Sequence, residues 1–189
     1  MIATTASHAH GVTHRLAALG APGLLGLVVI ALSACSAGGD RPQLDLPRAS
    51  IVTQAGGVAL NLDLRFRPST VQLDAMDHGV PLNFTIRVMG DGGAPAVSTG
   101  IGLRYFPLSR RYQLHLGAGD DRSFALRGYL LDALQRLSLP LPHDPCPGSG
   151  ACRVEARLDY SRLPGALRLP ALLRPAWHVP VATAVVSRP

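Results

Sequence analysis

The sequence predicts an α+β fold, a mainly antiparallel sheet of about six or seven strands with two helices packed on one face. Three observations predict it. Several short segments alternate apolar and polar residues, which is typical of strands with one buried and one solvated face. Two other segments have helix patterns: one has the residues of a capping box, and the other has apolar residues at helical spacing. Removing residues 1–34 from the 189 leaves 155, which is a suitable length for one domain.

Period-two alternation predicts strands in three segments: residues 60–67 (LNLDLRFR), 82–88 (LNFTIRV) and 152–160 (CRVEARLDY). In each of them the apolar residues share one face and the polar residues share the other. The predicted inward residues are Leu60, Leu62, Leu64, Phe66, Leu82, Phe84, Ile86, Val88, Val154, Ala156, Leu158 and Tyr160.

Residues 68–81 (PSTVQLDAMDHGVP) predict the first helix. Ser69 can cap it, Gln72 completes a capping box, and Gly79 and Pro81 close it. Residues 125–137 (ALRGYLLDALQRL) predict the second helix, because apolar residues recur there at helical spacing. We expect that stripe to pack in the core: Leu126, Leu130, Ala133, Leu134 and Leu137.

Residues 100–117 (GIGLRYFPLSRRYQLHLG) predict a hairpin that turns at residues 107–109, after a loop at residues 90–100. The prolines of residues 163–180 exclude a long helix there. We expect short turns that pack four side chains onto the sheet, followed by a last strand within residues 179–186. These side chains are Leu167, Leu169, Leu172 and Trp177.

The N-terminus has the pattern of a secretory signal peptide. Residues 1–15 carry no acidic residue, and an apolar run follows at residues 16–32. The alternative is an uncleaved membrane helix. The run is only marginally long enough to cross a bilayer, and its glycines and Pro22 weaken that alternative.

The run ends in Leu32-Ser33-Ala34-Cys35, which resembles the lipobox of bacterial lipoproteins. The resemblance implies that the Cys35 thiol is joined to diacylglycerol and that the leader is cut after Ala34. We therefore expect a signal peptide at 1–34, a lipid anchor and flexible tether at 35–55, and a single globular domain at 56–189. The protein would face the periplasm from the cell envelope, and Ser36 after the cysteine favours the outer membrane over the inner.

Cys146 and Cys152 remain, in DPCPGSGAC, where Pro147 and two glycines permit a tight reversal. In an oxidising compartment we expect them to form a disulfide. The alternative is a metal or redox pair, with His143 and Asp144 as further groups, but the sequence has no CxxC motif.

The formal net charge is +6, and all the Lys+Arg cations are arginine. A net positive charge often indicates a protein that binds nucleic acid. Export of this protein from the cytoplasm, which the signal peptide predicts, argues against that partner. Anionic lipid or cell wall fits the charge instead. The predicted partners are thus the membrane, through the lipid anchor, and an envelope protein.

Four stretches together resemble, in order, proteobacterial envelope proteins of domain-of-unknown-function family 4390. They are GVPLNFTIRV, LRYFPLSRRYQLHL, the helix around residues 130–137 and LDYSRLPGALRLPALLRPAW. The resemblance runs from about Val58 to Trp177 and implies an envelope protein of one domain, with no assigned activity. The glycine-rich MGDGGAPAV and the C-terminal VPVATAVV depart from the family pattern, which has more aromatic residues there.

The histidines His78, His115, His143 and His178 are scattered, and no HExxH, GxSxG or SxxK motif is present. We therefore predict no catalytic residue, no cofactor and no metal site. The leading hypothesis is a non-enzymatic lipoprotein that binds or scaffolds another envelope component. One alternative is a carrier or sensor of an apolar ligand, held between the sheet and the second helix. Another is a wall- or lipid-modifying enzyme, which would need Asp, His and Arg side chains to converge in a pocket.

Overall fold

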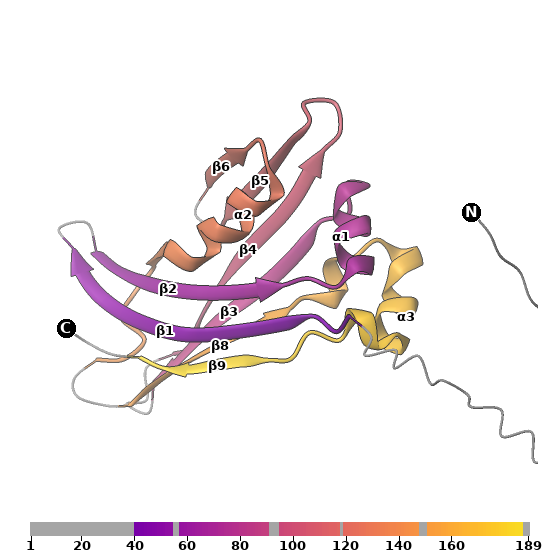
Figure 1. Cartoon of the computed structure of the whole chain (residues 1–189). Helices are drawn as coiled ribbons and strands as arrows, with labels where there is room; N and C mark the ends of the chain where they lie inside the picture. Colours follow the sequence, from indigo (N-terminus) through magenta and orange to yellow (C-terminus); the bar gives the residue numbers. More distant parts are fainter. Residues whose placement is uncertain (1–39, 55–56, 91–94, 118, 148–150, 187–189) are drawn as a thin grey trace, which may run out of the picture. The chain divides into compact units, whose positions relative to one another are not determined.

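The computed structural model describes residues 40–54, 57–90, 95–117, 119–147 and 151–186 (Figure 1). Cys35 and the predicted signal peptide lie outside the described residues. The described part has an α+β fold with mostly antiparallel sheets, which confirms the predicted class. It contains nine strands and three α-helices, more than the six or seven strands and two helices predicted from the sequence.

The larger sheet has six strands in the order β6-β5-β4-β3-β8-β9, and every neighbouring pair is antiparallel. The predicted hairpin is confirmed, with its turn after Phe106. The predicted last strand is confirmed as β9. The bounds are β3 (Leu82–Gly90), β4 (Val97–Phe106), β5 (Arg111–Leu116), β6 (Asp120–Phe124), β8 (Cys152–Leu158) and β9 (Ala182–Val185).

The smaller sheet has three strands in the order β1-β2-β7: β1 (Gln43–Gln54), β2 (Gly57–Arg67) and β7 (Leu137–Leu141). The expected tether at 35–55 is therefore wrong from Gln43 onward, and the folded domain starts before residue 56. A register shift between Asp45 and Arg48 explains why alternation did not reveal β1. The buried residues change there from Leu44 and Leu46 to Ala49 and Ile51.

The two sheets bury their apolar faces against each other in one contiguous core. Phe66 of β2 meets Phe84 of β3 edge-on, with ring centroids 4.8 Å apart. In Figure 1, β1 and β2 lie over β3, β8 and β9, and α2 (Arg127–Ala133) lies over β4 and β5. Because each strand alternates, the outer face of the six-stranded sheet is left mostly with polar residues and glycine.

The first predicted helix is confirmed as α1 (Thr70–Asp77). The Ser69 side chain accepts a hydrogen bond from the Gln72 amide at 3.1 Å, and the Gln72 side chain accepts one from the Ser69 amide. Gly79 follows the helix with φ 84°, a left-handed conformation that favours glycine.

The second predicted helix is confirmed in part. After α2 a 3-10 turn covers Leu134–Arg136, and β7 starts at Leu137. Leu130, Leu134 and Leu137 are buried as predicted. Leu126 is 58% exposed, so its predicted place in the core is wrong. It precedes the first turn of the helix, as its N-cap residue.

The predicted turns near the C-terminus are corrected to a helix, α3 (Gly165–Leu173), which contains Pro170 and is followed by a 3-10 turn at Pro175–Trp177. Trp177 is buried as expected. Leu169 and Leu172 are not packed on the sheet but are 65% and 56% exposed. Ala171 takes the buried position of this helix instead.

Cys146 and Cys152 form the predicted disulfide, which joins the start of β8 to the segment before it. Within the described ranges no three His, Cys, Asp or Glu side chains are grouped as metal ligands would be. Nor does any helix there reach the length and apolarity that crossing a bilayer requires.

Two glycines give opposite expectations for the same substitution. A Cβ at Gly90 would lie 2.5 Å from the Pro145 carbonyl oxygen, whereas a Cβ at Gly128, within α2, meets nothing within 4 Å. Gly90→Ala should lower the free energy of unfolding by about 1–3 kcal/mol through overpacking. Gly128→Ala should raise it by up to about 1 kcal/mol. Urea unfolding with the disulfide intact measures both, and equal destabilisation would contradict the packing described at Gly90.

Candidate binding groove

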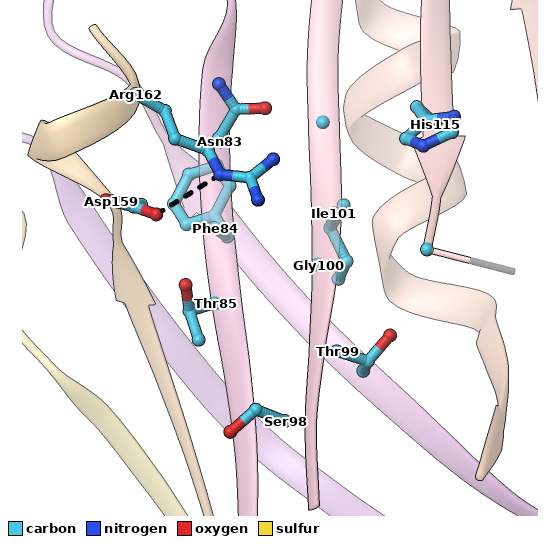
Figure 2. A pocket seen from close by; sticks show the side chains of 12 residues that line it. Asn83, Phe84, Thr85, Ser98, Thr99, Gly100, Ile101, His115, Asp159 and Arg162 are labelled. Carbon is cyan, nitrogen blue, oxygen red and sulfur yellow. Dashed lines mark ion pairs between the residues drawn. The ribbon is translucent and has the colours of Figure 1, made fainter. Parts of the chain in front are cut away.

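A groove of about 470 Å³ lies on the outer face of the six-stranded sheet. It crosses β3, β4 and β5 and reaches the 3-10 turn at Tyr160–Arg162 (Figure 2). The buried neighbours Leu82, Phe84 and Ile86 point into the core, so the residues between them point into the groove. The groove is lined by Asn83, Phe84, Thr85, Ser98, Thr99, Gly100, Ile101, Gly102, His115, Gly117, Asp159 and Arg162.

Two glycines of β4 form the floor of the groove. Gly100 pairs with Thr85 of β3, and Gly102 lies between Asn83 and His115. A Cβ at Gly102 would lie 3.1 Å from the Asn83 Oδ1 atom, whereas a Cβ at Gly100 would have its nearest neighbour at 4.0 Å. The groove therefore exists because β4 has no outward side chain at two successive outward positions.

Pairs of polar side chains stand on both sides of this floor. Arg162 Nε lies 3.5 Å from Asp159 Oδ2, and His115 Nδ1 lies 2.6 Å from Asp121 Oδ1. In Figure 2 the Asp159 and Arg162 side chains lie on one side of β4, and His115 lies on the other. The side chains of Arg162 and His115 are 69% and 59% exposed, so a ligand could reach both.

This lining suits a polar ligand better than an apolar one. The hydroxyl, amide, carboxylate and guanidinium groups offer both donors and acceptors. The glycine floor lets a ligand approach the backbone of β4 closely. Exposed pairs of this kind contribute little to stability, so a ligand can replace one partner of a pair at low cost.

Of the histidines noted in the sequence, His115 lines the groove, exposed on β5 as expected. The others lie elsewhere: His78 contacts the Asp74 carbonyl, His143 the Pro95 carbonyl and His178 the Leu172 carbonyl. Asp120 and Asp121 start β6, where Asp121 pairs with His115.

Sequence reasoning did not find the groove residues Asn83, Thr85, Ser98, Asp159 and Arg162. The available signal was the pair of glycines within the alternating stretch STGIGL, which leaves two strand positions without side chains. Pairing with β3 and β5 then decides which polar residues surround them.

A second polar cluster joins three elements on the other side of the sheet. The Tyr112 hydroxyl of β5 donates to Asp77 Oδ1 at 2.8 Å, and Arg127 of α2 pairs with Asp77 Oδ2 at 2.7 Å. Burial, and then the hydrogen bond to the Asp77 carboxylate, raise the pKa of Tyr112 to about 12. This cluster holds α1, β5 and α2 together and lies outside the groove lining.

Tyr112→Phe tests this cluster. Because the pKa of Tyr112 is raised from 10.0 to about 12, its protonated form stabilises the fold fully below pH 10 and progressively less as the pH rises toward 12. The substitution should remove a high-pH component from the tyrosinate absorbance titration and lower stability by about 1 kcal/mol at neutral pH. Tyr129→Phe, at a position 60% exposed, is the matched control. An unchanged titration above pH 11 in the Tyr112 variant would contradict the assignment.

No family model, no curated protein and no solved structure matches this chain. The resemblance to domain-of-unknown-function family 4390 therefore stays a prediction.

Proposed function

We propose that the chain is a proteobacterial envelope lipoprotein related to domain-of-unknown-function family 4390. Its domain would face the periplasm, held by a lipid on Cys35, preferentially at the outer membrane. The domain acts as a non-enzymatic module that binds an extended polar segment of another envelope protein. The observation that carries this proposal is the groove with its floor of Gly100 and Gly102.

The dimensions of the groove support an extended ligand. Its lining runs along β4 from Ser98 to Gly102, which are four steps of about 3.3 Å and thus about 13 Å. Such a length accommodates about four residues of an extended chain. The polar side chains of Asn83, Thr85 and Ser98 can satisfy backbone groups of that chain.

The disulfide supports the proposed compartment. Cys146 and Cys152 are both buried and paired, as expected of thiols in an oxidising envelope space. The anchor on Cys35 is supported by the lipobox-like Leu32-Ser33-Ala34-Cys35 at the end of the apolar run.

The packing beneath α2 favours a binding module over a carrier of an apolar ligand. Leu130 and Leu134 are fully buried, together with Leu114 and Leu116 of β5, in one contiguous core. These side chains fill the space where the carrier hypothesis would place its ligand.

An enzyme is the second candidate, because the groove brings His115, Asp159 and Arg162 to one place. The exposure of these groups favours binding. His115 and Asp121 are each 59% exposed, and the Arg162 side chain is 69% exposed. Catalytic groups act most strongly where water is excluded, and this lining stays open to solvent.

Site-specific photocrosslinking in living cells tests the proposal. A photoreactive residue at Thr85, inside the groove, should give a protein adduct that the same residue at Thr183 does not. Thr183 is exposed on β9 of the same sheet and is the matched control. Gly100→Tyr should abolish the adduct, because its side chain fills the groove from a position with room for a Cβ.

Two results would contradict binding through the groove: equal adducts at Thr85 and Thr183, or an adduct unaffected by Gly100→Tyr.

His115→Ala separates the two candidate functions. In a binding module, any loss of function in this variant should come with a proportionate loss of the adduct. If His115→Ala loses the phenotype that the unaltered protein restores to a deletion strain, while the adduct stays intact, an enzyme would be favoured.

A further inference from the structure

Helix α3 exposes an apolar face. Leu169, Leu172 and Leu173 are 65%, 56% and 70% exposed, although the helix is only nine residues long. The opposite side of the helix is held down by Ala171, which is fully buried. Three large apolar side chains gathered on one short helix form a patch of the kind that marks a contact with a partner or a membrane.

The charged residues of α3 and of the position directly after it are both arginine. Arg168 lies within α3 and Arg174 directly follows it, and both are exposed. Residues 160–189 contain no Asp or Glu, and the Asp40 carboxylate at this end of the domain accepts a hydrogen bond from the Thr70 amide. Leucine with flanking arginine is the composition of helices that lie in the interface of an anionic bilayer.

The start of the described chain lies at the same end of the domain as α3 (Figure 1). The Asp40 carboxylate accepts a hydrogen bond from the Thr70 amide at the start of α1. Next to it, Ser69 Oγ donates to the Ala176 carbonyl oxygen at 2.6 Å, in the 3-10 turn that follows α3. Direct contacts thus link the start of α1 both to Asp40 and to the 3-10 turn after α3.

The length of chain between Cys35 and Asp40 places this end near the proposed anchor. Five Cα–Cα steps separate the two residues, and these span at most about 18 Å when fully extended. A lipid on Cys35 would therefore keep the α3 end of the domain close to the bilayer surface.

We propose that the face of α3 formed by Leu169, Leu172 and Leu173 rests in the headgroup region of an anionic phospholipid bilayer, with Arg168 and Arg174 contacting lipid phosphates. The proposal rests on the anchoring of Cys35 and adds a second, non-covalent attachment. A diacylglycerol anchor holds the chain to the membrane at one point, and a second contact would in addition orient the domain on the membrane.

Fluorescence quenching by brominated lipids tests this. The lipidated full-length protein is reconstituted in phosphatidylglycerol–phosphatidylcholine vesicles carrying brominated acyl chains. Leu172→Trp should add an emission component that is blue-shifted and quenched. Trp177, which is buried, gives the same background in every variant. Adding Leu169→Glu and Leu173→Glu should reduce the quenching of that component at least severalfold.

Val185→Trp is the matched control. Val185 is 75% exposed and pairs with Arg153, near the start of β8. The chain leads toward α3 from the opposite end of β8, at Leu158. The length of β8 separates the two ends by roughly 20 Å. The tryptophan at Val185 should therefore stay unquenched.

Vesicle flotation of the same samples separates the two proposals. If the protein floats but the tryptophans of Leu172→Trp and Val185→Trp are quenched equally, the α3 contact is overturned and the anchor stands. Failure to float would overturn the anchor and this inference with it. A blue shift that needs no vesicles and grows with protein concentration would assign the face to a second copy of the chain, and would also overturn it.

Discussion

The structure depends on the burial of two apolar sheet faces against each other. Phe66 and Phe84 meet between the sheets, and the leucines around them fill one continuous core. Because a strand alternates its side chains, this burial leaves the opposite face of the six-stranded sheet mostly to polar residues and glycine. The groove is the direct consequence: Gly100 and Gly102 fall on that outer face, where a larger residue would otherwise cover the backbone.

A second constraint fixes the end of the domain from which the chain leads back toward Cys35. The capping residues Ser69 and Gln72 satisfy the start of α1 and also bond to the carbonyl groups of Ala176 and Trp177. One short motif thus joins β2, α1 and the segment after α3. The proposed membrane contact uses leucines of α3 that do not line the groove.

Local chemistry predicted much of this fold. The capping box at Ser69 and the alternating residues of β2, β3 and β8 could be read directly, because neighbours in sequence decide them. Strand β1 could not be predicted from alternation, because a register shift at Pro47 changes which residues face inward. The groove depends on pairing between β3, β4 and β5, which no single segment encodes. The sequence predicts that Leu169 and Leu172 pack on the sheet, whereas both are exposed because α3 packs through Ala171.

Both the proposed function and the proposed membrane contact depend on a lipid at Cys35. Intact-mass and peptide mass spectrometry of the mature protein, isolated from membranes, measures this most directly. We expect a chain that begins at Cys35 and carries a diacylglycerol group on its thiol, with Cys146 and Cys152 oxidised. A mature chain that begins elsewhere, or a Cys35 with an unmodified thiol, would contradict it.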